Sequence, residues 1–134
     1  MNTELRERKI RTFRDLYAWQ EGHKFVLIVY ELSKKFPKDE LFALTSQLRR
    51  AVVSITSNLA EGFSRATYKD KANFYSTALA SLTESQNQLV VALDVKYILA
   101  IEFDTAWNQS ITVSKLINGL IKSTRSYQAP LHNS

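Results

Sequence analysis

The sequence contains no cysteine among its 134 residues, which excludes a disulfide framework and any cysteine-ligated zinc or iron–sulfur site. Its stability must come from packing, and the reducing cytoplasm suits such a chain, so we expect a cytoplasmic protein. No apolar run approaches the roughly 20 residues that a membrane-spanning helix needs. The opening segment MNTELRERKIRTF mixes charged and polar residues where a secretory signal would be apolar. We therefore expect neither export nor insertion into a membrane.

Glycine, proline and histidine are also scarce, with three, two and two residues respectively. The three glycines are isolated from one another, so no glycine-rich phosphate loop is present. A di-iron site in a helical bundle requires a Glu-x-x-His motif on each of two helices, which His23 and His132 do not provide. The serines are scattered through helical segments without the strand-to-helix elbow of a nucleophile. We therefore expect no metal, no cofactor and no enzymatic activity.

The residues that are present favour long helices around a single core. Hydrophobic residues make up 45% and charged residues 23% of the chain, a composition typical of one folded domain. From Asp15, a plausible N-cap, to Phe36, apolar residues follow two helical stripes, and Pro37 ends the segment. The middle of this helix is apolar over an unusually wide arc, which predicts either deep burial or a subunit contact.

Three further segments show helical spacing of apolar residues. The second, about 44–63, ends near Gly62, and Ser64 or Thr67 would cap the third, about 68–98. Between Ala72 and Val95 the only charged residues are Glu84 and Asp94, which suits packing on more than one side. A fourth amphipathic helix covers about 103–126. Short connections favour antiparallel neighbours.

These elements predict an all-α protein, an up-down-up-down antiparallel four-helix bundle. The bundle would span residues 15–126, with helices at about 15–36, 44–63, 68–98 and 103–126. A basic N-terminal arm, 1–14, would precede it, and a flexible tail, 127–134, would follow it.

Positive charge is clustered along the chain, whose formal net charge is +5. Arginines and lysines fill residues 6–14, and the only charged residues after Asp104 are basic. Such clusters either follow a phosphate backbone or are solvated faces that keep the protein soluble. On the first interpretation, the nucleic-acid-binding candidates are Arg49, Arg65, Lys69, Lys71, Lys115, Lys122 and Arg125.

The run LTSQLRRAVVSITSNLAEGFSRAT, residues 44–67, resembles the signature of the bacterial ribosomal-RNA intervening-sequence protein family, to which the Avd accessory proteins of diversity-generating retroelements belong. FRDLYAW (13–19), ELSKKFPKDELFAL (31–44) and ASLTESQNQL (80–89) resemble other parts of the same family. The resemblance implies a bundle that assembles into a homopentamer. It also implies a basic surface that, in the retroelement branch, engages RNA and a reverse transcriptase. The signature positions that match are Gln47, Arg49, Arg50, Ser54, Asn58, Glu61, Gly62 and Glu84.

Apart from Arg49, these signature residues are expected to be structural rather than RNA-contacting. Glu84, as the lone acid in the middle of a weakly charged helix, would be buried and paired with Arg50 or Asn58. Gly62 would either adopt a positive φ or allow two backbones to approach closely.

We therefore expect a non-enzymatic, oligomeric nucleic-acid-binding accessory protein, with RNA as the ligand, that acts through its basic surface and assists a reverse transcriptase. The alternative is an oligomeric scaffold that acts through protein contacts, with the positive charge serving only solubility.

Overall fold

The computed structural model describes residues 8–133, and the surroundings of side chains for residues 8–127. Within this range the chain forms four long α-helices and no strand. A 3₁₀ turn precedes the first helix, and a 3₁₀ turn and a π-helical turn join the first helix to the second. The elements are η1 (Phe13–Asp15), α2 (Tyr17–Ser33), η2 (Lys38–Glu40), η3 (Leu41–Thr45), α3 (Ser46–Ser64), α4 (Tyr68–Asp94) and α5 (Ala100–Asn133).

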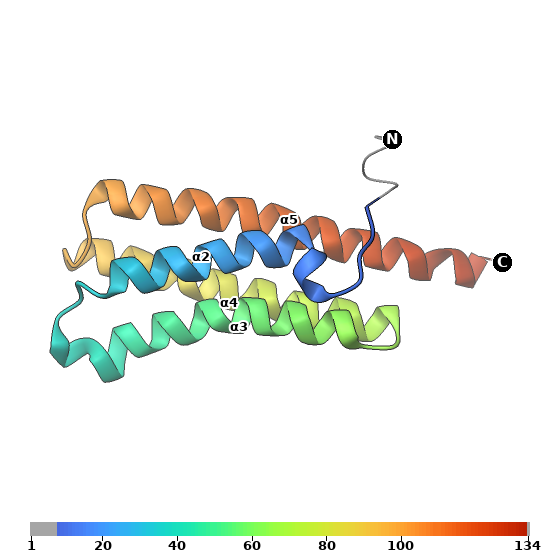
Figure 1. The fold of residues 1–134 in the computed structure, drawn as a ribbon, viewed down its shortest axis with the longest axis horizontal. Helices are drawn as coiled ribbons and strands as arrows, with labels where there is room; N and C mark the ends of the chain where they lie inside the picture. Colours follow the sequence, from blue (N-terminus) through green and yellow to red (C-terminus); the bar gives the residue numbers. More distant parts are fainter. Residues whose placement is uncertain (1–7, 134) are drawn as a thin grey trace.

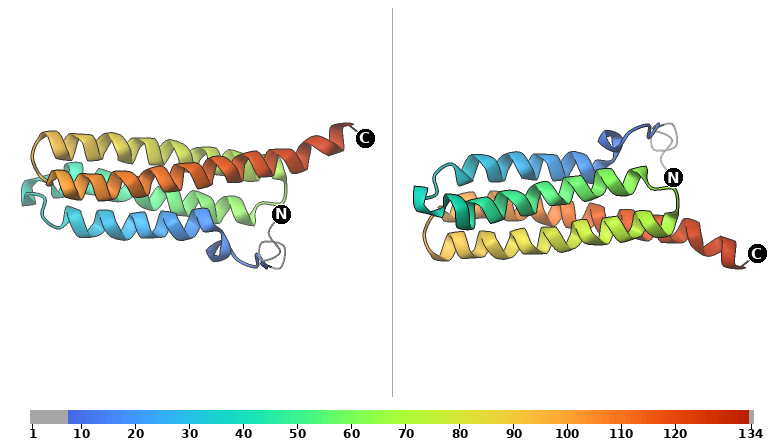
Figure 2. Two further views of the ribbon diagram at one scale, coloured as in Figure 1. Left: turned by 90° about the horizontal axis from the view of Figure 1, so that it is seen from above. Right: turned by 90° about the horizontal axis from the view of Figure 1, so that it is seen from below.

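The four helices run alternately up and down the long axis of the molecule (Figure 1). Each of α2 and α4 packs against both α3 and α5, which is the neighbour pattern of an antiparallel four-helix bundle. The predicted all-α four-helix architecture is confirmed. Because the number of helices is even, η1, the α3–α4 connection and the last part of α5 lie at the same end, where α5 extends beyond the other helices (Figure 2).

The core is built from the apolar stripes of all four helices. Phe25 and Val29 on α2 are fully buried, whereas Leu27, on the other predicted stripe of α2, is 56% exposed. Only part of the wide apolar arc of α2 therefore faces the core. The other large side chains that are at most 2% exposed are Leu48, Val52, Ile55, Leu59, Tyr75, Leu82, Leu89, Val113 and Ile117.

Two predicted helix ends were too late because local hydrogen bonds end the helix earlier. The first helix ends at Ser33 rather than at residue 36, since the amide of Phe36 donates to the carbonyl of Ser33 in a turn that leads to Pro37. The third helix ends at Asp94 rather than at residue 98, because Lys96 adopts a left-handed backbone with φ of 69°. A non-glycine residue rarely adopts this conformation.

Other predicted limits were also wrong. Asp15 does not cap the first helix, because it lies within η1. The N-cap position is Leu16, which makes no side-chain cap bond. α5 begins at Ala100 rather than at 103 and continues to Asn133, so the segment expected to be a tail is helical over the described residues. The ring of Tyr127 stacks on that of Tyr68, with 5.7 Å between their centroids, and this contact supports the extension of α5. Thr67 caps α4, as one of the two predicted candidates.

Gly62 lies at a point where α3 and α4 approach each other closely. It does not adopt a positive φ, so the close-approach alternative is the correct one. A Cβ atom placed on Gly62 would lie 2.7 Å from Cε1 of Tyr75 and 2.9 Å from Cβ of Phe74. The absent side chain therefore allows the Tyr75 ring to enter the core.

We expect the stability of the protein to fall as the pH rises from about 10 to about 12. The Tyr75 side chain is 2% exposed, and its burial raises its pKa from 10.0 to about 12. In this window the folded state keeps the phenol proton that the unfolded state loses. The contribution of the protonated Tyr75 to the free energy of unfolding is therefore complete below pH 10 and declines above it. Urea unfolding at successive pH values should show a shallower alkaline decline for Tyr75→Phe than for the wild type, and parallel declines would contradict the assignment.

Candidate nucleic-acid interface

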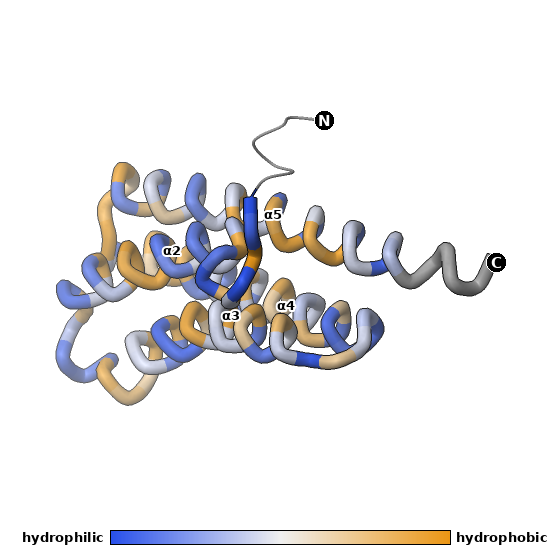
Figure 3. Tube along the Cα trace, turned by 45° about the vertical axis from the view of Figure 1, so that its right-hand side comes forward, coloured by the Kyte–Doolittle hydropathy of each residue, from blue (hydrophilic) through white to orange (hydrophobic). Residues whose placement is uncertain are grey.

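Three basic segments that are distant in sequence meet at one end of the bundle (Figure 1). They are the segment up to and including η1, the α3–α4 connection with the first turn of α4, and the part of α5 from Lys115 onward. The tube in Figure 3 shows strongly hydrophilic residues in the first of these and at the α3–α4 connection. We call this region the basic end, and its cations are Arg8, Lys9, Arg11, Arg14, Arg65, Lys69, Lys71, Lys115, Lys122 and Arg125.

Few carboxylates accompany these cations. Among residues 8–127, the acidic residues of the basic end are Asp15, Glu61 and Asp70, and no ion pair in this range involves a basic-end cation. The opposite end differs, because Lys34 pairs with Glu31 at 3.0 Å and Lys35 pairs with Glu102. Positive charge is therefore concentrated at one end, where it creates a field that attracts polyanions.

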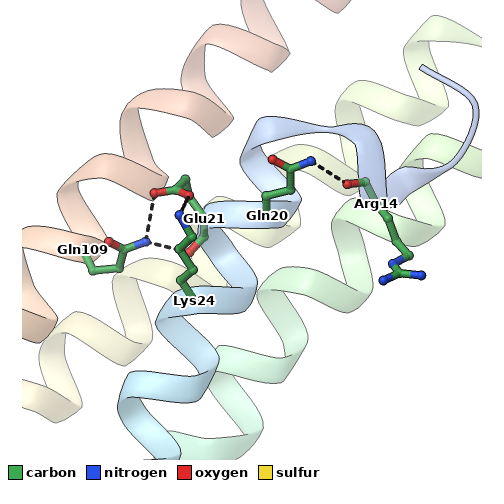
Figure 4. Close-up of polar contacts among 5 residues, drawn as sticks. All are labelled: Arg14, Gln20, Glu21, Lys24 and Gln109. Carbon is green, nitrogen blue, oxygen red and sulfur yellow. Dashed lines mark hydrogen bonds and ion pairs between the residues drawn. The ribbon is translucent and has the colours of Figure 1, made fainter. Parts of the chain in front are cut away.

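The segment before η1 is held by a capping box. A carboxylate oxygen of Asp15 accepts hydrogen bonds from the backbone amides of Arg11, at 2.8 Å, and Thr12, at 2.9 Å. These amide bonds, from Thr12 first and then Arg11, lower the pKa of Asp15. Gln20 on α2 donates to the carbonyl oxygen of Arg14 at 2.9 Å (Figure 4). The cations of this segment are therefore carried on backbone that is fixed to α2.

α2 is in turn fixed to α5 by polar contacts (Figure 4). Gln109 donates to the carbonyl oxygen of Glu21 at 2.8 Å, and the Glu21 carboxylate pairs with Lys24 at 2.7 Å. Hydrogen bonding to Lys24, followed by that to Gln109, lowers the pKa of Glu21. This contact sets the position of the N-terminal cations relative to those of α5.

Around the α3–α4 connection, two of the three cations contact their own chain. The Arg65 guanidinium lies over the Phe74 ring, 4.4 Å from its centroid. Lys71 donates to the carbonyl oxygen of Phe63 at 2.5 Å and lies over its ring. Lys69 is exposed. Because cation–π contacts leave the outer face of a guanidinium accessible, Arg65 and Lys69 are available to a ligand, whereas Lys71 is largely occupied.

On α5, Lys115 and Lys122 are seven residues apart and share a helix face, and Arg125 follows one turn later. All three are exposed. Lys115 also lines the same groove as Arg8. The N-terminal cations were noted as a basic cluster but were not included among the predicted binding residues. The up-down-up-down topology was the signal that could have added them to the predicted binding residues, because four antiparallel helices return the chain to the end at which it starts.

Arg49 does not join this surface. Its Nε donates to Ser33 Oγ at 2.8 Å, its guanidinium lies 4.9 Å from the centroid of the Tyr30 ring, and its side chain is half-buried. It lies near the start of α3, whereas Arg65 follows the end of that helix, about 24 Å away at ~1.5 Å per residue. The structure therefore separates Arg49 from the other predicted binding residues.

The signature residues form an exposed polar stripe on α3 rather than a buried network. Gln47, Arg50 and Glu61 are exposed and Ser54 and Asn58 are half-buried, at the three- and four-residue intervals that place them on one helix face. Asn58 donates to the carbonyl oxygen of Ser54 at 2.8 Å, and the Ser54 hydroxyl bonds that of Ser81 on α4 at 2.8 Å.

The expected burial of Glu84 was wrong. Glu84 is exposed, and its recorded partner within the described chain is Gln88, which donates to its carboxylate at 3.1 Å. Neither Arg50 nor Asn58 is its partner, since Asn58 instead donates to Ser54.

The described residues offer neither a metal site nor a membrane span. No group of three or more histidine or acidic side chains among these residues could hold a metal ion. None of the helices in the described range is both long and apolar enough to cross a membrane.

Comparisons with known proteins agree with the fold. Residues 14–119 match the model of a family described as 23S rRNA-intervening sequence protein. A crystal structure of a protein of unknown function from the S23 ribosomal protein family of Bacteroides thetaiotaomicron is similar in fold. Its TM-score is 0.73 and its sequence identity 23%, over 78% of this chain and 95% of that chain. No curated protein matches. Because the family model covers most of the sequence, the chain belongs to the 23S rRNA-intervening sequence protein family.

Proposed function

We propose that this protein is a non-enzymatic, oligomeric nucleic-acid-binding accessory protein whose ligand is RNA. The observation that carries the proposal is the basic end, where three segments distant in sequence bring their cations together with few carboxylates. Such a surface binds phosphates, and binding releases the counterions condensed on the nucleic acid. The family description names a ribosomal RNA, which favours RNA over DNA.

The distribution of the cations favours recognition of shape over reading of sequence. Exposed lysines and arginines contact phosphates, which position a protein without specifying bases. Structured RNA is recognised largely in this way, through its backbone and overall shape. Several copies of the chain around a symmetry axis would multiply weak contacts into useful affinity, and the resemblance to Avd proteins suggests a homopentamer with a reverse transcriptase as its protein partner.

We expect the protein to bind structured RNA more tightly than duplex DNA of equal length at physiological salt. Fluorescence anisotropy of the two labelled nucleic acids across a salt series measures this directly. A logarithmic plot of affinity against salt should be linear, with a slope that counts the phosphate contacts. Affinity that is identical for both polymers, or that disappears with modest salt, would mean only non-specific charge attraction.

A second function, an oligomeric scaffold acting through protein contacts, is favoured by a separate observation. The Phe42 side chain in η3 is 94% exposed, and Leu27 on α2 is 56% exposed. Large apolar side chains exposed in this way are typical anchors of protein interfaces. Sedimentation of the wild type and of Phe42→Ser tests whether Phe42 holds the assembly together, and RNA anisotropy of the wild type at physiological salt distinguishes the functions, because a scaffold would assemble without binding RNA there.

A further inference from the structure

A groove of about 570 Å³ separates the N-terminal segment from α5. One wall carries Ile10 and Tyr17, whose side chains are 41% and 45% exposed, and the other carries Leu116 and Leu120. The groove adjoins the basic end, but its walls are mainly apolar. Apolar walls cannot pair with phosphates, so this groove needs an explanation other than binding of the nucleic-acid backbone.

Gly119 lies in the floor of this groove, in the interior of α5. A Cβ atom on Gly119 would meet nothing within 4 Å, whereas one on Gly62 would meet Tyr75 and one on Gly22 would meet Thr56 at 3.3 Å. An interior glycine destabilises a helix relative to alanine, and packing within the described chain does not require it here. The missing side chain instead deepens the groove for something that approaches the α5 backbone from outside.

The spacing of the α5 residues in the groove fits another helix. Leu116, Gly119, Leu120 and Ser123 lie at i, i+3, i+4 and i+7, so they form one face of α5 that lines the groove. Leu116 and Leu120 are half-buried at the edge of the core, and Gly119 and Ser123 are exposed. Small residues at such a face reduce the distance between packed helix axes. An amphipathic helix that lies along a groove is a common mode of peptide recognition.

The charge around the groove indicates the polar face of that helix. Arg8 and Lys115 both line it, and the Arg8 guanidinium lies 3.7 Å from the centroid of the Tyr17 ring. No carboxylate of the described chain lines the groove. An occupant with acidic residues beside its apolar stripe would complement these cations.

We propose that this groove is the docking site for an acidic amphipathic helix of a partner protein. The apolar stripe of that helix packs on Leu116, Leu120 and Tyr17, its backbone approaches Gly119, and its carboxylates face Arg8 and Lys115. This site is separate from the proposed RNA function, because the apolar surface, rather than the exposed cations alone, recognises the partner.

The test uses a labelled synthetic 18-residue peptide with leucines at helical i, i+3, i+4 and i+7 positions and glutamates at its flanks. A peptide of the same composition, with the leucines distributed around the helix, is the comparison. Fluorescence anisotropy with the full chain should show binding of the patterned peptide and at least about tenfold weaker binding of the other. Equal binding of the two peptides would overturn the proposal.

Two substitutions place the binding in the groove. Gly119→Leu adds a side chain whose Cβ meets nothing within 4 Å, so it should fill the groove and weaken binding at least about tenfold. Asn118→Leu adds the same side chain at an exposed neighbouring position that does not line the groove and should not weaken binding. Ile10→Glu, on the opposite wall, should repel the acidic peptide without disturbing the core. Peptide binding that survives both Gly119→Leu and Ile10→Glu in proteins with unchanged circular dichroism would overturn the proposal.

RNA and a second copy of the chain are the two alternative occupants of the groove, and Gly119→Leu would affect a different measurement for each. If Gly119→Leu lowered RNA affinity by the same factor as peptide affinity, the groove would belong to the nucleic-acid surface. If it changed the mass of the protein in sedimentation, the occupant would be a second copy of the chain. Either result would overturn the proposal, and unchanged RNA affinity and unchanged mass are expected.

Discussion

Replacement of Gly62 with valine is expected to lower the free energy of unfolding by about 3 kcal/mol, at the upper end of the usual cost of overpacking. The first added atom, Cβ, would lie 2.7 Å from the Tyr75 ring and 2.9 Å from Cβ of Phe74. The Tyr75 ring is buried and Phe74 Cβ is attached directly to the α4 backbone, so neither can move without separating α3 from α4. Urea unfolding at a fixed protein concentration measures the change.

The matched control for Gly62→Val is Gly119→Ala. Both glycines lie inside helices, but a Cβ on Gly119 would meet nothing within 4 Å. Alanine there should raise the free energy of unfolding by about 1 kcal/mol, the difference in helix propensity. If both substitutions stabilised the protein, the close approach of α3 and α4 at Gly62 would be contradicted.

Neutralisation of Lys115, Lys122 and Arg125 together to glutamine is expected to weaken RNA binding by about a hundredfold at low salt. These three side chains are exposed on the part of α5 from Lys115 onward, and each would neutralise one phosphate. The slope of the logarithmic salt plot should fall by about 2 to 3, since each lost phosphate contact contributes about 0.7 to 0.9. The core of the bundle does not depend on these residues, so the melting temperature should be unchanged.

The matched control replaces Lys34, Lys35 and Lys38, at the opposite end, with glutamine. It changes the net charge by the same amount but leaves the basic end intact. Lys34 and Lys35 already pair with Glu31 and Glu102, so RNA affinity should change little. An equal loss of affinity in the two triple variants would mean that net charge alone, and not the basic end, attracts the nucleic acid.

The four helices could be predicted because their apolar residues repeat at helical intervals, and the cap at Thr67 because a short polar side chain before a helix is a strong signal. The end of α4 could not, because nothing in the type of Lys96 indicates a positive φ. Its conformation is set by the hydrogen bonds from Lys96 and Tyr97 back to α4, which form only once the chain turns into α5.

The candidate site could be predicted only in part. The basic clusters are visible in the sequence, and the antiparallel bundle explains why they meet. Lys71 donates to the Phe63 carbonyl oxygen and Arg49 donates to Ser33 on another helix. Both side chains are therefore engaged in contacts that residue types do not specify. The reasoning about Glu84 failed for a related reason, because a helix with few charges can still expose a carboxylate to solvent.

The even number of helices also has a practical consequence for protein engineering. Because the first and last described residues lie at the same end of the bundle (Figure 2), a tandem single-chain version of two copies would need a linker that crosses only the width of a bundle. Such a fusion would fix the ratio of variant to wild-type basic ends within one polypeptide. For the same reason, an affinity tag at either terminus would lie beside the basic end, whereas a tag inserted at the α4–α5 connection would lie at the opposite end.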